Sequence, residues 1–214
     1  MSTFFSIYGQ MLIRSILIHL QYVLICVSAG FALGLTLGIA LSRLPPKYSA
    51  AILPVLSVFQ TIPGIVFIGV LFLWIGMVPA TAIIALSVYA MFPVLKNTYT
   101  GIRQVDAGYC EAAVGCGMTP TQVLFRVELP LALPTIIGGL RLSTVYTISW
   151  AVLASMIGLG GLGDFIYQGV SSNNNTLIVA GAIPAAVMAV AAGALIDRVQ
   201  KKVVPRGLRK EASS

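Results

Sequence analysis

The sequence has few charged residues, and this scarcity excludes most classes of protein. Only 9% of its 214 residues are Asp, Glu, Lys or Arg, whereas 58% are hydrophobic and the mean hydropathy is +0.96. An ordinary soluble domain carries about a quarter charged residues, so this chain lacks the polar groups to cover a water-exposed surface. A soluble enzyme, a disordered tail and a disulfide-stapled secreted module are therefore excluded. An all-α integral membrane protein remains.

Residues that bind metals or perform catalysis are also scarce. The chain has one histidine, three cysteines and six acidic residues, and it contains no CxxC, HExxH or Walker A sequence. We therefore expect no catalytic residues, no metal site and no cofactor bound by this chain, and we expect structural roles for Cys26, Cys110 and Cys116. Residues 158–163 have the spelling GxGxxG, but they follow an apolar segment instead of a β-strand. They predict a flexible outer loop, not a dinucleotide site.

Long apolar stretches define the expected architecture. A bilayer core requires about 20 apolar residues in a helix, and five stretches qualify, so residues 1–214 are expected to form one transmembrane domain. The segment before the first stretch is expected to be a short interfacial helix, with His19 as a polar anchor at the membrane edge. The expected spans are residues 15–41, 51–75, 78–95, 132–157 and 177–195.

Basic residues set the expected orientation, because cytoplasmic loops of membrane proteins are enriched in Lys and Arg. Of the 13 basic residues, six lie in the tail 198–214, and others, including Arg141, surround the connection 96–131 between spans three and four. If these segments face the cytoplasm, only Arg14 lies outside. We therefore expect an external N-terminus, a cytoplasmic C-terminus and a basic tail beside anionic lipid. No aromatic or motif pattern accompanies the charge, so nucleic-acid binding is not expected.

Polar residues within the apolar spans are candidates for a translocation path, because such residues are costly in a bilayer unless they are satisfied. Each of them alone could instead make a helix–helix hydrogen bond. As a set on three helices they favour a path, and prolines in spans two and three indicate interrupted helices of the kind that line protein or water. The path candidates are Gln60, Thr61, Tyr89, Thr147 and Trp150.

The expected cytoplasmic loop has the pattern of a helix, a hinge and a second helix. Gly117 suits a helix C-terminus, and Thr119 followed by Pro120 suits an N-cap with proline at the first helical position. Pro130 ends the second helix before span four. An exposed helical elbow of this kind, with small residues on its surface, is suited to docking another protein.

The spacing in this loop resembles the coupling motif of binding-protein-dependent ABC importer permeases. That motif is Glu-Ala-Ala, three residues, Gly, nine residues, an aliphatic residue, any residue and Leu-Pro. Its places are filled here by Glu111, Ala112, Ala113, Gly117, Val127, Leu129 and Pro130. Val127 stands where isoleucine is common. Segments 60–64, 96–102 and 160–166 resemble the osmoprotectant branch, which imports glycine betaine, carnitine or choline.

The resemblance implies the fold and the partners. It implies a five-helix type I ABC importer permease, similar to that of a methionine importer, in a bacterial inner membrane. Two permeases, identical or paralogous, would form the pathway, and a pair of cytoplasmic ATPase subunits would bind the elbows and carry ATP and Mg. An external binding protein would deliver the solute. The alternatives are a permease for amino acids or another small zwitterion, and an ion-coupled secondary carrier. A carrier commonly shows inverted repeats and ionisable residues inside its spans, and we expect neither.

Overall fold

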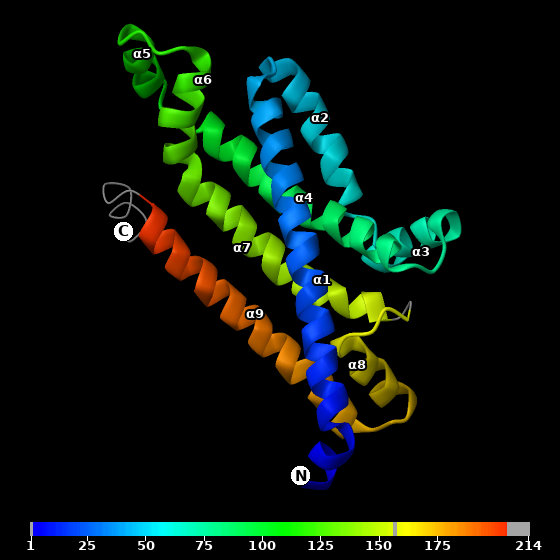
Figure 1. The fold of residues 1–214 in the computed structure, drawn as a ribbon. Coiled ribbons are helices and arrows are strands. Elements are labelled where there is room, and N and C mark those ends of the chain that lie inside the picture. Colours follow the sequence, from blue (N-terminus) through cyan, green and yellow to red (C-terminus); the bar gives the residue numbers. More distant parts are fainter. Residues whose placement is uncertain (1, 156–157, 205–214) are drawn as a thin grey trace.

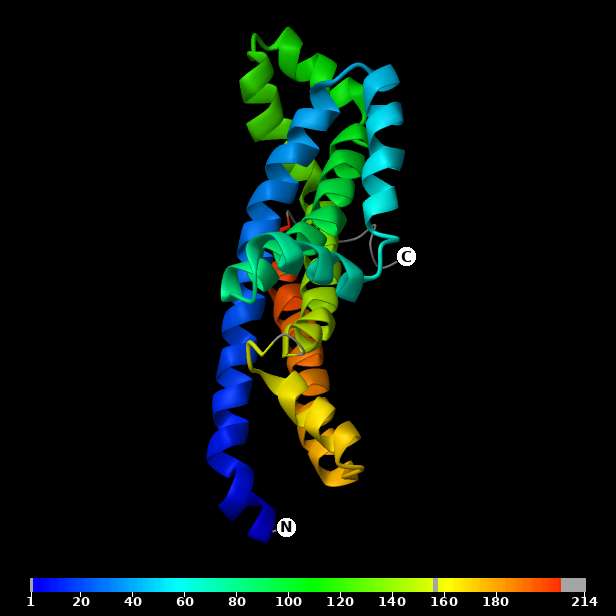
Figure 2. The same ribbon diagram turned by 90° about the vertical axis from the view of Figure 1, so that its right-hand side faces the viewer.

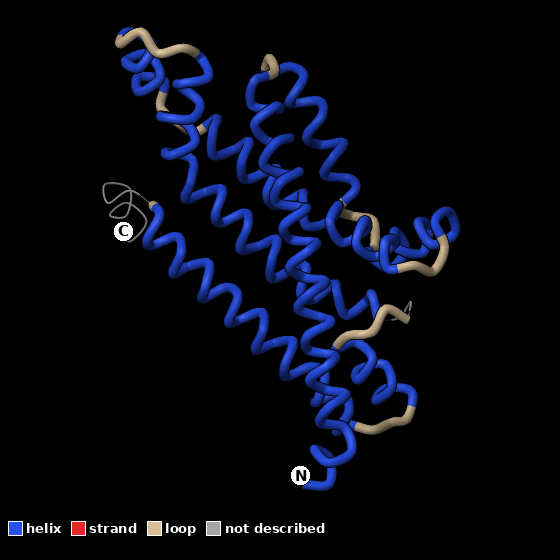
Figure 3. Tube along the Cα trace, viewed as in Figure 1, coloured by secondary structure: helices blue, strands red, loops and turns tan. Residues whose placement is uncertain are grey.

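The computed structural model describes residues 2–155 and 158–204, and for residues 2–5 only the backbone is described. Every regular element within these residues is helical (Figures 1 and 3), which confirms the all-α membrane fold. The elements are α1 (Ser2–Arg43), α2 (Pro46–Phe59), α3 (Gly64–Ile75), α4 (Pro79–Arg103), α5 (Ala107–Gly115), α6 (Pro120–Val123), the π-helix η1 (Leu124–Glu128), α7 (Leu129–Ala154), α8 (Leu162–Ser171) and α9 (Asn175–Val203).

Helix α1 is longer than expected and packs closely along α4. It is one helix of 42 residues from Ser2, so the expected separate interfacial helix is wrong. A Cβ added at Gly30, Gly34 or Gly38 would lie 2.6 Å from an atom of α4 in each case. These three glycines lie on one face because they are spaced by four residues. Their lack of side chains allows the two backbones to approach, as in other membrane helix pairs.

The second expected span is broken into two helices. Helices α2 and α3 are bent by 86° at residues 60–63, which confirms that the span expected at residues 51–75 is interrupted. Pro63 has φ −56° and ψ 131°; its ring disfavours the helical conformation of the residue before it and removes one backbone donor. Pro54 and Pro93, by contrast, lie inside α2 and α4. Figure 2 shows α3 lying across the bundle instead of along it.

Four further helices or helix runs are long and apolar enough to span a membrane, and the bent pair α2–α3 makes up to five spans among the described residues. Helices α1, α4 and α9 end beyond the last residue expected for their spans. Helix α7 ends at Ala154, before the expected residue 157, and residues 156–157 lie outside the described residues. Buried residues of α1, α4 and α7 form the central core. It comprises Val23, Cys26, Ala82, Leu86, Ile148, Ala151 and Ala154.

Residues 158–161 of the loop expected at 158–163 form a turn, and its last two residues belong to the next helix. Gly158, Gly160 and Gly161 have φ values of 76°, 76° and 114°, which favour glycine, and α8 then begins at Leu162. His19 lies beneath this turn and is 1% exposed. Its Nε2 is 3.1 Å from the carbonyl oxygen of Ile148 on α7, so it joins two helices instead of anchoring the chain at the membrane edge.

One basic residue also lies where it was not expected. Arg141 is inside α7, not beside the connection, and its Nε is 2.9 Å from Oδ1 of Asp197 on α9. Both side chains are about half exposed. The spans therefore do carry ionisable residues, but this pair neutralises its own charge between two helices.

Candidate functional site

The elbow between α4 and α7 is built by local hydrogen bonds at each of its bends. Asp106 caps α5, because its side chain accepts a hydrogen bond from the backbone N–H of Gly108 at 2.7 Å. Gly117 follows α5 with φ +82°. Its N–H donates to the carbonyl of Val114, and the N–H of Met118 donates to that of Ala113. These two bonds form a Schellman motif, which ends the helix with a left-handed glycine.

The second half of the elbow begins with a capping box and continues as a π-helix. The Thr119 side chain accepts from the N–H of Gln122, and the Gln122 side chain accepts from the N–H of Thr119. Pro120 occupies the first helical turn, as its fixed φ favours. The π-helix η1 then leads into α7 without a gap. The sequence contained no signal for this π turn, which is rare and often found at functional sites.

The motif residues have different exposures on the elbow. Glu111 and Ala112 are exposed, whereas Ala113 is buried. Leu129 and Pro130 are partly buried and line a shallow apolar hollow together with Phe125, Leu133 and Val203. The elbow lies at the end of the bundle where α1 turns into α2, opposite the N-terminus (Figures 1 and 2). It therefore presents an exposed carboxylate and small residues at one end of the molecule.

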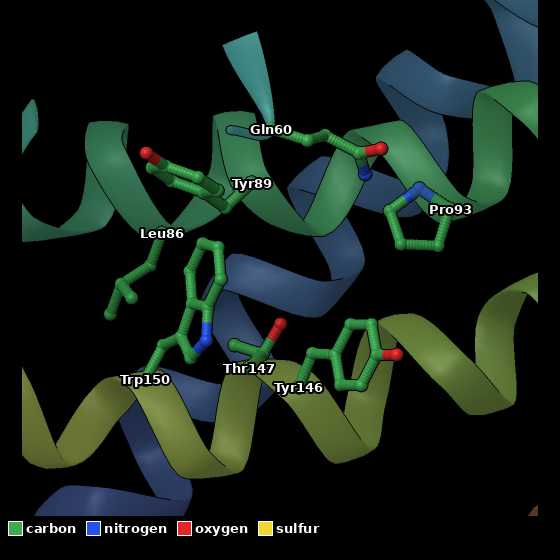
Figure 4. A pocket seen from close by; sticks show the side chains of 7 residues that line it. All are labelled: Gln60, Leu86, Tyr89, Pro93, Tyr146, Thr147 and Trp150. Carbon is green, nitrogen blue, oxygen red and sulfur yellow. The ribbon is translucent and has the colours of Figure 1, made fainter. Parts of the chain in front are cut away.

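The second candidate site is a central cavity of about 190 Å³ between the α2–α3 break, α4 and α7 (Figure 4). It includes four of the five expected path residues. The exception is Thr61, which is exposed and whose hydroxyl donates to the carbonyl of Val58, at the end of α2, at 2.7 Å. The lining residues are Gln60, Leu86, Tyr89, Pro93, Tyr146, Thr147 and Trp150.

Aromatic rings dominate the cavity. The rings of Tyr89 and Trp150 are 4.0 Å apart between centroids and inclined by 73°, and Phe67 contacts Tyr89 at 5.5 Å and 78°. The Tyr89 hydroxyl donates to the carbonyl oxygen of Ile62 at 2.6 Å. This bond satisfies a backbone acceptor freed by the break and joins α4 to it. None of the seven lining residues carries a formal charge.

Among the other hydroxyls of α7, that of Ser143 joins two helices, whereas that of Thr147 bonds within its own helix. Ser143 donates to the carbonyl of Ala90 on α4 at 2.6 Å, and the Thr147 hydroxyl donates to the Ser143 carbonyl at 2.7 Å. Sequence reasoning missed Leu86, Pro93 and Tyr146 as lining residues. Leu86 and Pro93 lie three and four residues from Tyr89, and Tyr146 lies four from Trp150. Helical periodicity around these two aromatic residues could therefore have found them.

Within the described residues, no group of three or more His, Cys, Asp or Glu side chains could hold a metal ion. Cys26 is buried, and its thiol lies 3.7 Å from the carbonyl oxygen of Ile83, whereas Cys116 on the elbow is exposed. All three cysteines are free thiols. The arrangement offers an exposed helical elbow and an uncharged aromatic cavity.

Comparison with known proteins gives a consistent result. The family model described as "Binding-protein-dependent transport system inner membrane component" matches residues 30–208. The carnitine transport permease protein OpuCB of Listeria monocytogenes is 39% identical over 97% of this chain and 94% of its own length. The glycine betaine/carnitine/choline permease OpuCB of Bacillus subtilis is 38% identical, with coverages of 98% and 96%.

Solved structures match the fold. An inward-facing structure of the MetNI methionine ABC transporter matches with a TM-score of 0.83 over 92% of this chain and 98% of its own. Its sequence identity is 21%, so the match concerns the fold alone. It confirms the expected architecture, that of a type I ABC importer permease. In this chain the second span of that architecture is the bent pair α2–α3.

Proposed function

Because the chain belongs to the family of binding-protein-dependent transport system inner-membrane components, we propose that it is the permease subunit of an ATP-driven importer for a compact quaternary-ammonium osmoprotectant. Glycine betaine, carnitine and choline are the candidate solutes. The observation that carries the proposal is the complete coupling motif on an exposed elbow at one end of the bundle. The names of relatives at 38–39% identity support the solute class.

The elbow is the proposed docking element for a cytoplasmic ATPase subunit. The exposed Glu111 and Ala112 contact the partner, while the Gly117 bend and the Leu129–Pro130 junction set the direction of the docking helix. ATP and Mg reside on the ATPase pair, and this chain supplies no catalytic residue. ATP binding can drive the permease only if the closed ATPase pair favours one permease conformation over the other. The elbow is where that preference is exerted.

The cavity is the proposed path for the solute. Cation–π attraction to desolvated rings is worth about 2 kcal/mol, and Tyr89 and Trp150 present such rings between α4 and α7. A compact quaternary ammonium has no hydrogen-bond donor on its cation, so an uncharged aromatic lining suits it better than a carboxylate with unused acceptors. Gln60 and Thr147 supply polar contacts, and Thr61 would take part only if the α2–α3 break moved.

A second permease, identical or paralogous, is proposed to cover the α2–α3 side. Irregular backbone is not tolerated against lipid tails, since its N–H and C=O groups lack partners there. In residues 60–63 the N–H groups of 60–62 bond to α2 and the Ile62 carbonyl accepts from Tyr89. Gln60 and Thr61 are nevertheless exposed, and polar side chains are costly against lipid. The positive-inside argument places the elbow in the cytoplasm and the N-terminus outside, where an external binding protein delivers the solute.

The uptake assay separates the candidate solutes. Proteoliposomes containing the permease, its ATPase and its binding protein should accumulate labelled glycine betaine, carnitine or choline when ATP is enclosed with the ATPase. Methionine serves as the amino-acid arm. If methionine is taken up and the three quaternary-ammonium solutes are not, the solute is an amino acid instead. Uptake by the permease alone, driven by an ion gradient, would refute the importer function.

The cavity is tested by Trp150→Leu, with Trp74→Leu as a matched control because Trp74 is 86% exposed and outside the cavity lining. Loss of about 2 kcal/mol of cation–π attraction corresponds to a roughly 30-fold slower uptake at low solute concentration. Trp150→Phe should retain part of the rate. Wild-type uptake by Trp150→Leu would remove the cavity from the path.

A further inference from the structure

The last residue of α1 is joined to the base of the elbow by a bidentate ion pair. Nη1 of Arg43 is 3.2 Å from Oε1 of Glu128, and Nη2 donates to Oε2 of the same carboxylate. Glu128 is 9% exposed, and the two residues are 85 positions apart in the sequence. Arg43 stands at a helix C-terminus, where the helix dipole favours a cation. The fork-to-fork geometry fixes orientation as well as distance.

Glu128 occupies a junction between three segments. It is the final residue of the π-helix η1, directly before α7 begins, and so marks the end of the elbow. Its Oε1 is also 3.9 Å from the thiol sulfur of Cys110 on α5. A single carboxylate therefore contacts α1 and α5 from the point at which the elbow enters α7. Glu128 is the unspecified residue of the coupling motif, between Val127 and Leu129.

Helix α1 continues this connection to the cavity. The glycine face of α1 lies so close to α4 that a Cβ at Gly34 would be 2.6 Å from the carbonyl oxygen of Met91. Backbones packed this closely transmit strain to one another, because there is no soft side chain between them. Helix α4 carries Tyr89, whose ring and hydroxyl lie at the cavity and the α2–α3 break. A chain of direct contacts therefore runs from the elbow through Glu128, Arg43, α1 and α4 to the cavity.

We infer that the Arg43–Glu128 pair is a positioning contact that transmits displacement of the elbow to the α1–α4 unit. The inference rests on the proposed importer function. Without the pair, the elbow still binds the ATPase and its motion still reaches α7 through the covalent chain, but α1 and α4 no longer follow. ATP hydrolysis then continues with little solute transport.

The test measures solute transported per ATP hydrolysed in proteoliposomes that contain the whole complex. Arg43→Gln and Glu128→Gln should each lower this ratio at least about tenfold, while the amount of ATPase that co-purifies stays at the wild-type level. The double variant Arg43→Glu/Glu128→Arg should recover much of the ratio, because the pair is restored with its charges exchanged. Arg43→Lys keeps the charge but loses the fork, and it should lie between wild type and Arg43→Gln.

Arg141→Gln is the matched control. It removes the same kind of Arg–carboxylate pair, but between α7 and α9 and away from the elbow, so its ratio should equal that of wild type. Wild-type ratios in Arg43→Gln and Glu128→Gln would overturn the inference, and so would loss of ATPase co-purification in both, which would indicate docking instead of transmission. If the wild-type complex shows no ATP-driven uptake, the proposed function fails first.

Discussion

On the glycine face of α1, a Gly→Ala substitution should lower the stability of the folded chain, which is the opposite of its usual effect in a helix. Alanine in place of a helical glycine normally stabilises a helix by about 1 kcal/mol. At Gly34 the added methyl would lie 2.6 Å from the Met91 carbonyl oxygen and 2.8 Å from the Cβ of Val94. Neither atom is the end of a flexible side chain, so the helices themselves must separate. Gly34→Ala should therefore destabilise the folded chain.

The size of the effect follows from this separation. Ordinary contacts begin near 3.4 Å, so α1 and α4 must move apart by roughly 0.8 Å at this point. Overpacking of a close interface typically costs about 1–3 kcal/mol, from which the gain in helix propensity of about 1 kcal/mol must be subtracted. The net loss in free energy of unfolding should therefore reach about 2 kcal/mol. The loss for Gly38→Ala should be similar, because the Cβ of Thr98 would lie 2.6 Å from the added methyl.

The assay is unfolding of the purified chain by SDS in mixed micelles, followed by tryptophan fluorescence. Gly138→Ala is the matched control, because Gly138 is an exposed residue of α7 with no atom within 4 Å of an added Cβ. That variant should be as stable as wild type or up to about 1 kcal/mol more stable. If Gly34→Ala and Gly138→Ala unfold at the same SDS fraction, close packing of α1 on α4 is not what holds these helices together.

Three further predictions concern the elbow and the break. Gly117→Leu should leave membrane insertion intact but abolish ATP-dependent uptake. A φ of +82° strains any L-residue by about 1–2 kcal/mol, so the substitution redirects the docking helix. Normal uptake with unaltered ATPase co-purification would contradict this. Cys116 is exposed and Cys26 is buried, so an impermeant maleimide should label Cys116 in inside-out vesicles only. Labelling of Cys116 in intact cells would show that the elbow faces outward, opposite to the proposed orientation. Tyr89→Phe keeps the ring but leaves the Ile62 carbonyl without its donor, and it should lower stability by about 1–3 kcal/mol in the same SDS titration.

Several features of this protein could be predicted from the sequence because they depend on local chemistry. The membrane class follows from 9% charged residues, since no arrangement of such a chain can cover a surface in water. The bends of the elbow follow from Gly117 and from Thr119 with Pro120, because a left-handed glycine and an N-cap act over a few residues. Gly30, Gly34 and Gly38 are spaced by four residues, a pattern typical of a close helix contact in a membrane.

Other features depend on which helices become neighbours, and no local pattern contains that information. Pro54, Pro63 and Pro93 look alike in the sequence, yet only Pro63 lies at the 86° break, whereas α2 and α4 continue through the other two. His19 was read as an edge residue because its partner, the Ile148 carbonyl, is 129 residues away. Thr61 and Gln60 are adjacent, but the turn of the chain at the break leaves only Gln60 in the cavity.

By itself, then, the sequence determined the membrane setting, the helical content and the shape of the elbow, because hydropathy, glycine conformation and capping act within a few residues. The tertiary structure alone decided that Tyr89 meets Trp150, that Arg43 meets Glu128 and that Arg141 meets Asp197. Each of these contacts joins segments more than 50 residues apart. Their partners are chosen by how closely α1, α4, α7 and α9 can pack, which is a property of the whole bundle.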